Sequence, residues 1–85
     1  MTRAERILEA LQQAFPGARL QLDDESHLHA GHAGAATGRS HYRLLIVWPA
    51  FAGQNSVARH RAIYAALGDL MQTDIHALSI DARDA

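Results

Sequence analysis

The chain has no cysteine among its 85 residues. This absence excludes a disulfide framework, a thiolate metal site and a cysteine nucleophile supplied by the chain itself. An iron–sulfur centre or another soft-metal site would therefore need sulfur ligands from a different molecule.

Lysine is also absent, and all eight basic residues are arginine. Nine carboxylates balance them, so the formal net charge is −1 and the isoelectric point is about 6.6. Proteins that bind phosphate backbones rely on a basic surface. The composition therefore disfavours tight, nonspecific binding to nucleic acid.

Long apolar segments are missing as well. No run approaches the roughly 20 apolar residues that a membrane span requires, and residues 1–6 contain no apolar secretory core. These features predict a soluble protein of the cytoplasm that has no membrane segment.

The apolar core is expected to be thin. Of the 41 residues counted as hydrophobic, 17 are alanine. A chain of this length buries only about 60–65% of the surface that its unfolded form exposes. We therefore expect one domain over residues 1–85, without a second core, an internal repeat or a linker.

Two segments have the apolar spacing of helices. The first begins with a capping-box spacing between Thr2 and Glu5 and is ended by Pro16-Gly17. The second is expected to start at an N-cap on Ser56 and to end at Thr73-Asp74. Its predicted buried stripe consists of Val57, His60, Ile63, Tyr64, Leu67, Leu70 and Met71.

Three segments are predicted to be strands, at residues 19–24, 41–48 and 75–80. The second contains a continuous apolar run, which is typical of a central strand covered on both faces. Residues 81–85 are expected to form a polar tail, and residues 25–38, rich in glycine, alanine and histidine, a loop. The predicted order is αββαβ, an α+β fold with a three-stranded mixed sheet covered by helices.

The topology brings distant histidines to one end of the sheet. If the second and third strands are parallel, both begin at the same edge. His27, His29, His32 and His41 fall within fifteen residues and flank a segment rich in glycine and alanine, and His76 lies near the start of the third strand. Imidazole is a common metal ligand, so this arrangement indicates metal binding or proton chemistry.

Plainer interpretations of these histidines stay open. Histidines on a loop are often merely solvated, and the HxxH spacing of His29 and His32 does not define a face on a loop. His76 is expected to share a strand face with Leu78 and Ile80, which fits a partly buried, hydrogen-bonded histidine as well as a ligand.

Two other functions are less well supported by the residues. Arg59 and Arg61 offer contacts to phosphate, but neighbours on a helix point in different directions, and a solvated face is the simpler interpretation. Ser26 and Ser40 lie close to histidines, but no nucleophile elbow surrounds either serine. We therefore do not expect an enzyme.

Four segments together resemble the successive signatures of BolA-like proteins. They are DESHLHAGH at residues 24–32, GRSHYR at 38–43, VARHRAIY at 57–64 and IHAL at 75–78. The resemblance spans residues 3 to 81. It implies a KH-like αββαβ domain, which agrees with the order predicted from the periodicity.

The resemblance also implies a cofactor and a partner. BolA-like proteins associate with monothiol glutaredoxins and share a [2Fe–2S] cluster with them, in iron–sulfur trafficking or iron sensing. By similarity, His76 is one cluster ligand and His29 the second, with His32 as an alternative. The thiolates would come from the glutaredoxin and its glutathione. Some members are described as transcriptional regulators, so weak DNA binding through Arg59 and Arg61 is the alternative function.

One departure from the family pattern lies next to His76. Asp74 occupies a position that is commonly glycine in the family. Because aspartate can tolerate a left-handed turn, the pattern allows that conformation here.

Overall fold

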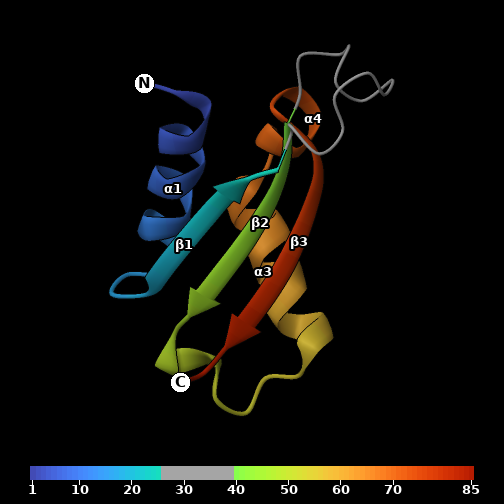
Figure 1. Ribbon diagram of the computed structural model, residues 1–85. Coiled ribbons are helices and arrows are strands. Elements are labelled where there is room, and N and C mark those ends of the chain that lie inside the picture. The colour runs from blue at the N-terminus through green and yellow to red at the C-terminus, as the bar shows by residue number, and fades with distance from the viewer. Residues whose placement is uncertain (26–39) are drawn as a thin grey trace.

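The computed structural model describes residues 1–25 and 40–85. The elements are α1 (Arg3–Ala14), β1 (Arg19–Asp24), β2 (Ser40–Val47), the 3-10 helix η2 (Pro49–Phe51), α3 (Ser56–Leu67), α4 (Leu70–Thr73) and β3 (Ile75–Arg83). A three-stranded sheet forms one layer, and α1 and α3 form the other (Figure 1). The predicted α+β fold is confirmed.

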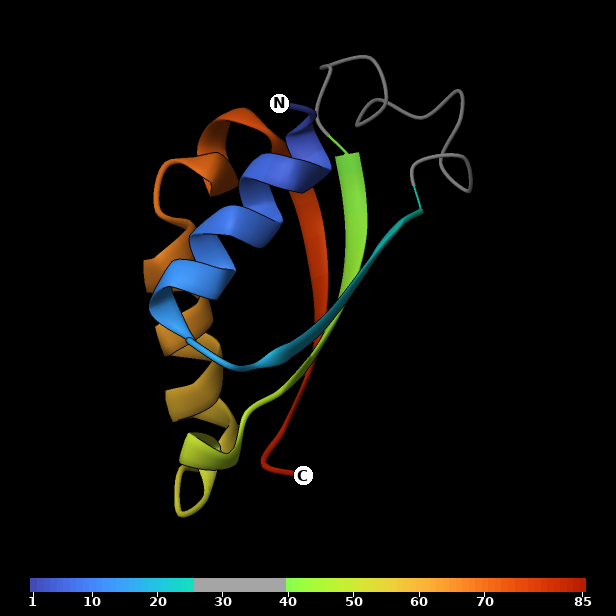
Figure 2. The ribbon, with the colours of Figure 1, turned by 90° about the vertical axis from the view of Figure 1, so that its left-hand side faces the viewer.

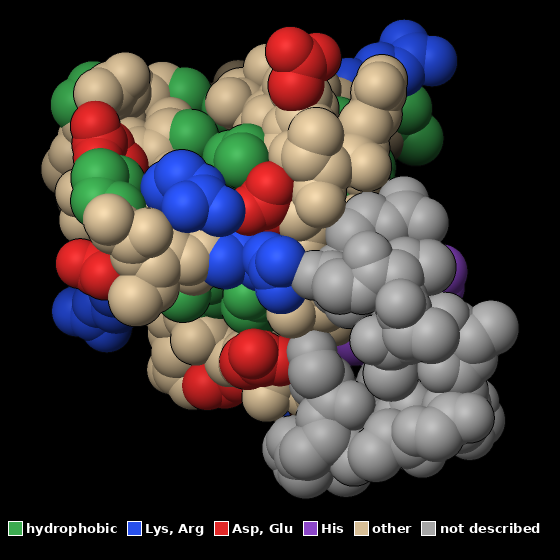
Figure 3. All heavy atoms as spheres, turned by 90° about the horizontal axis from the view of Figure 1, so that it is seen from above, with side chains coloured by type: hydrophobic (Ala, Val, Ile, Leu, Met, Phe, Trp, Pro, Cys, Tyr) green, Lys and Arg blue, Asp and Glu red, His purple; other side chains and the backbone are tan. Residues whose placement is uncertain are grey.

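The sheet has the order β1-β2-β3. β2 pairs antiparallel with β1 and parallel with β3, so the predicted central strand and the predicted parallel pair are both confirmed. β2 and β3 start at the same end of the molecule, beside α4 (Figure 1). Figure 3 looks down on this end, where arginine and acidic side chains lie next to one another.

α1 begins as the sequence predicts. The Thr2 hydroxyl accepts a hydrogen bond from the Glu5 amide at 3.1 Å, and the Glu5 carboxylate accepts one from the Thr2 amide at 3.0 Å. This reciprocal pair satisfies two amides that the first turn leaves without helical partners. The helix ends at Ala14 with Phe15 as its C-cap, and Gly17 takes the positive φ of 80° that turns the chain into β1.

The prediction that β2 is covered on both faces is wrong. Both long helices lie on one side of the sheet (Figure 2). Burial therefore alternates along β2: Tyr42, Leu44 and Ile46 are buried beneath the helices, whereas Leu45 and Val47 are only partly buried. We call the side of the sheet that carries Leu45 and Val47 the open face.

The second predicted helix differs from expectation at its start. Its N-cap is Asn55, not Ser56, since the Asn55 side-chain oxygen accepts a hydrogen bond from the Ala58 amide at 2.9 Å. The helix is also interrupted, because Gly68 adopts a positive φ of 52° and separates α3 from the short α4.

The buried stripe of α3 also differs from the prediction. Ile63 and Leu67, four residues apart, face the sheet and are buried. Val57 and Tyr64 were predicted to be buried, but the line along the helix that they share is turned away from the line of Ile63 and Leu67, and they are 57% and 43% exposed.

β3 is longer than predicted and includes most of the expected polar tail. Its parallel pairing with β2 continues to Val47 and Arg83, and the Trp48 amide donates to the Arg83 carbonyl at 2.9 Å. Backbone hydrogen bonds extend the strand, and the polar side chains of residues 81–83 gave no sign of this pairing.

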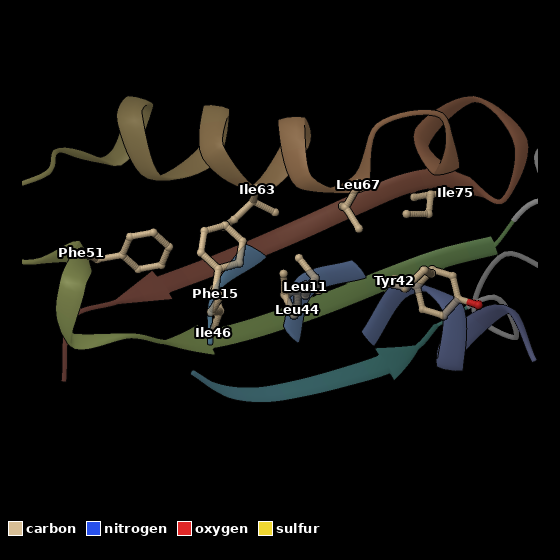
Figure 4. Close-up of a cluster of buried hydrophobic side chains, with 10 residues drawn as sticks. Leu11, Phe15, Tyr42, Leu44, Ile46, Phe51, Ile63, Leu67 and Ile75 are labelled. Atoms are coloured by element: carbon tan, nitrogen blue, oxygen red, sulfur yellow. The ribbon is translucent and has the colours of Figure 1, made fainter. Parts of the chain in front are cut away.

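The core lies between the two layers (Figure 4). Its buried members come from every long element except β1, and they are Ile7, Leu11, Phe15, Tyr42, Leu44, Ile46, Phe51, Ile63, Leu67 and Ile75. Phe15, Trp48 and Phe51 pack edge-on or tilted against one another at the end of the sheet opposite α4, with ring centroids 5.1 to 5.5 Å apart. The indole of Trp48 donates to the Pro16 carbonyl at 2.9 Å and so ties η2 to the turn after α1.

Candidate metal centre

Two histidines meet where β2 and β3 begin. His41 is the second residue of β2 and His76 is the second residue of β3. Their ring centroids are 4.8 Å apart and the ring planes are inclined by 48°. His41 is partly buried and His76 is exposed. The prediction that the topology brings His76 to the start of β2 is therefore confirmed.

A bulge in β3 determines which way His76 points. Ser40 pairs with Ile75, but His41 pairs with Ala77, so His76 is an extra residue in β3. We call this irregularity the His76 bulge. An extra residue shifts the alternation of every residue after it. Leu78 therefore pairs with buried Tyr42 on the helix-covered face, whereas His76 lies with His41 on the open face.

The expectation that His76 shares a face with Leu78 and Ile80 is thus wrong. That expectation assumed a regular strand, in which residues 76, 78 and 80 point to one side. With the bulge in place, His76 is exposed and available to a ligand, while Leu78 and Ile80 are partly buried against the core.

The other predicted ligands, His29 and His32, belong to residues 26–39 and lie outside the described residues. His27 lies there too. Within residues 1–25 and 40–85, no group of three or more His, Cys, Asp or Glu side chains is arranged to hold a metal ion.

Asp74 anchors a polar cluster at the end of the sheet where β2 and β3 begin, on the side that faces α1. Its side chain is 11% exposed and forms an ion pair with Arg6 and another with Arg3, whose Nε lies 3.4 Å from Oδ2. The Thr73 hydroxyl also donates to this carboxylate, at 2.7 Å. These contacts, the Thr73 bond first and the Arg6 bond next, hold the pKa of Asp74 below its usual value.

The left-handed turn considered for Asp74 does not occur. Its φ is −117° and its ψ is −26°, within the range that any residue adopts at the end of a helix. The aspartate is used instead for its carboxylate. The sequence did not predict this cluster, because Arg3 and Arg6 are separated from Asp74 by about seventy residues. Its one sequence signal was the charged residue at position 74, where the family pattern commonly has glycine.

Comparison with known proteins identifies the family. Residues 11–85 match the family described as BolA-like protein. The chain belongs to the BolA-like family.

Solved structures agree with this assignment. The BolA domain of SufE1 from Arabidopsis thaliana superposes with a TM-score of 0.82 and 41% identity, covering 98% of this chain and 92% of that one. BolA1 from the same plant superposes with a TM-score of 0.81 and 40% identity over 98% and 92% of the two chains. The DNA-binding transcriptional regulator BolA of Escherichia coli is 38% identical over 89% of this chain and 70% of its own.

Some relatives are much longer than this BolA-like chain. It spans 24% of SufE-like protein 1 and 51% of BOLA1 from Arabidopsis thaliana. The first is named as chloroplastic or mitochondrial and the second as chloroplastic. In the described part of the chain, no helix has the length and apolar character needed to cross a membrane. The cytoplasmic location stays a prediction.

The described residues suit one side of a shared cluster. A BolA-like chain without cysteine cannot offer a thiolate to iron, so its histidine nitrogens are the candidate ligands. His76 is exposed on the open face, so its imidazole can reach a group held by another molecule. His41 packs against it and limits the orientations that the His76 ring can take. The donor chemistry thus fits a cluster whose thiolates come from elsewhere.

The two arginines of the predicted nucleic-acid surface have different surroundings. The Arg59 guanidinium donates to the Ala82 carbonyl at 3.0 Å and to the Phe51 carbonyl at 3.1 Å, and it stacks over the Phe51 ring. Arg61 is exposed. Arg59 is therefore engaged in joining α3, η2 and β3, while Arg61 remains accessible to a phosphate.

Proposed function

We propose that this BolA-like chain is a non-enzymatic adaptor that binds a monothiol glutaredoxin and shares a [2Fe–2S] cluster with it. Iron–sulfur trafficking or iron sensing is the corresponding cellular role. The observation that carries the proposal is the exposed imidazole of His76, packed against His41 in a family member that has no cysteine. Such a chain can supply imidazole ligands to a cluster but no thiolate ligands.

The proposed ligands divide between the two molecules. His76 supplies nitrogen from β3, and His29, or His32 in its place, supplies the second nitrogen. The glutaredoxin cysteine and glutathione supply sulfur. Imidazole ligation in place of two thiolates raises the reduction potential of a [2Fe–2S] cluster. The cluster, when bound, would thus have both nitrogen and sulfur ligands, with the nitrogen ligands supplied by this chain's histidines.

The test is anaerobic reconstitution of the chain with a monothiol glutaredoxin and glutathione, followed by absorption and circular dichroism. We expect a spectrum that differs from that of the glutaredoxin cluster alone. His76→Ala should remove this difference. His60→Ala is the matched control, because His60 lies on α3 in the helix layer and should leave the spectrum unchanged. An unchanged spectrum in His76→Ala would overturn the proposed ligation.

The second ligand needs its own variants. His29→Ala should weaken the complex without abolishing it if His32 can substitute. The double variant His29→Ala/His32→Ala should then lose as much as His76→Ala. A double variant that behaves as the wild-type chain would exclude both residues as ligands.

A DNA-binding regulator is the second candidate function, favoured by the 38% identity to a protein named as a DNA-binding transcriptional regulator. The net charge of −1 and the absence of lysine argue for weak binding. The logarithm of the DNA affinity should fall linearly with the logarithm of the salt concentration, with a slope of about −0.9 for each phosphate neutralised. Arg61→Gln tests DNA binding more directly than a substitution of Arg59, because Arg59 also donates hydrogen bonds that join α3 to η2 and β3. Tight binding with a steep salt slope that Arg61→Gln reduces would favour the regulator.

A further inference from the structure

Arg3 links the beginnings of β2 and β3 through a single guanidinium group. Its NH1 donates to the Ser40 hydroxyl at 2.9 Å, and its Nε donates to Asp74 Oδ2 at 3.4 Å. Ser40 is the first residue of β2, and Asp74 immediately precedes β3. α1 thereby reaches over both strand starts with one side chain. The planar fork of arginine suits such a bridge, because its donors have fixed relative directions.

The bridge is supported by the surrounding contacts. Ser40 is 6% exposed, and its amide donates to the Asp74 carbonyl at 3.1 Å. The Asp74 carboxylate accepts further hydrogen bonds from Arg6 and from the Thr73 hydroxyl. The Arg3 side chain itself is 35% exposed. Water therefore weakens the attraction between the charges of Arg3 and Asp74. The directed hydrogen bonds of the guanidinium contribute more to holding the two strand starts together than its charge does.

The bridged residues shortly precede the two histidines along the chain. His41 directly follows Ser40, and His76 is two residues after Asp74. The backbone ladder is irregular at this point, because the His76 bulge falls between the pairs formed by Ser40 and His41. A bulge leaves its extra residue outside the regular pairing and bends the strand locally. Ladder hydrogen bonds alone therefore restrain His76 less than they restrain the rest of β3.

We propose that Arg3 is a positioning residue that holds the start of β2 against the start of β3 and so fixes the spacing of the His41 and His76 rings. Arg3 acts through Ser40 and Asp74, the two residues to which its guanidinium donates. The consequence for a shared cluster rests on the proposed function. The spacing of the rings does not, and it can be measured in the chain alone.

The first experiment follows the two rings by NMR in the isolated chain. Wild-type protein should show nuclear Overhauser effects between the ring protons of His41 and His76. Arg3→Gln should weaken them, and Ser40→Ala should do so as well because it removes one end of the bridge. Arg3→Lys keeps the charge but cannot bridge two acceptors in fixed directions, so it should resemble Arg3→Gln. Ring contacts that persist in Arg3→Gln, or that Arg3→Lys fully restores, would overturn the proposal.

Arg59→Gln is the matched control for general loosening of the fold. It also removes an arginine that joins two segments, but its contacts with Phe51 and Ala82 lie at the opposite end of the sheet. We expect it to lower stability without altering the contacts between the rings. If Arg59→Gln weakens those contacts as much as Arg3→Gln does, the effect of Arg3 is only a loss of stability and the proposal is wrong.

The second experiment repeats the glutaredoxin reconstitution with Arg3→Gln. Loss of a residue that orients a metal ligand typically costs 10–100-fold in metal affinity, so we expect about a 10-fold loss of the His76-dependent cluster. If wild-type chain forms no shared cluster, the proposed function fails while the NMR result still decides the role of Arg3. A cluster that Arg3→Gln retains at full affinity would overturn the functional part of the inference.

Discussion

The rings of His41 and His76 pack against each other with their centroids 4.8 Å apart, although the two residues belong to different strands. Parallel pairing brings the strand starts together, and the His76 bulge turns the second ring to the open face. An imidazole pair at the exposed end of a sheet combines an accessible ligand with a neighbour that restricts its movement. This relationship is the basis of the proposed metal chemistry.

His76→Ala should leave the fold intact. The side chain is exposed and contributes little to the core, and substitutions at such positions change stability by no more than about 0.5 kcal/mol. Urea denaturation followed by the fluorescence of Trp48, the single tryptophan, measures this. Leu44→Ala is the contrasting variant, with an expected cost of about 2–5 kcal/mol because Leu44 is fully buried. A comparable loss in His76→Ala would show that its spectral effects arise from unfolding.

Asn55→Ala should destabilise the protein by about 1 kcal/mol, because the Asn55 side chain caps the first turn of α3. Ser56→Ala, one residue further on, should change stability by less than about 0.5 kcal/mol. Thermal unfolding of the two variants side by side distinguishes the observed cap from the one predicted from the sequence. A larger effect for Ser56→Ala would contradict the cap seen in the structure.

Arg59→Gln should cost about 1–3 kcal/mol, since a charged guanidinium donates to two backbone carbonyls and stacks on Phe51. Arg61→Gln should be close to neutral because Arg61 is exposed. Chemical denaturation of both variants measures the difference. Equal stability of the two would mean that the Arg59 contacts contribute nothing to the free energy of unfolding.

Asp74→Asn should lower stability at neutral pH and lose its effect in acid. The pKa of Asp74 is lowered in the folded protein relative to an ordinary value of 3.8. A carboxylate with a lowered folded pKa contributes stability that is fully present above the unfolded pKa and is lost as the pH falls through the folded pKa. The stability gap between wild type and variant should therefore be constant from about pH 7 to about pH 5 and close as the pH falls below the ordinary value of 3.8.

Denaturation curves for both proteins across this range provide the measurement. The gap itself should be about 1–2 kcal/mol, because the partner arginines are partly exposed and water screens their charges. A gap that widens on acidification would contradict the sign of the pKa shift.

The sequence by itself determined the order of elements and the family. Local signals were sufficient where neighbouring residues decide the structure: the Thr2–Glu5 capping box, the stop at Pro16-Gly17 and the alternation in residues 19–24 all correspond to observed elements. The parallel pairing of β2 with β3 followed from their connection through a helix. The placement of His76 at the end of the sheet where β2 begins therefore needed no coordinates.

The tertiary structure alone decided which faces are open and which side chains are available. The apolar run in β2 cannot reveal that both helices lie on one side of the sheet, since that depends on how the helices pack. The face of His76 depends on one extra residue in the pairing of β3, and a regular alternation gives the opposite answer. Arg3 and Asp74 meet only because the fold brings α1 over the strand starts, so their contact is a product of packing that no local pattern encodes.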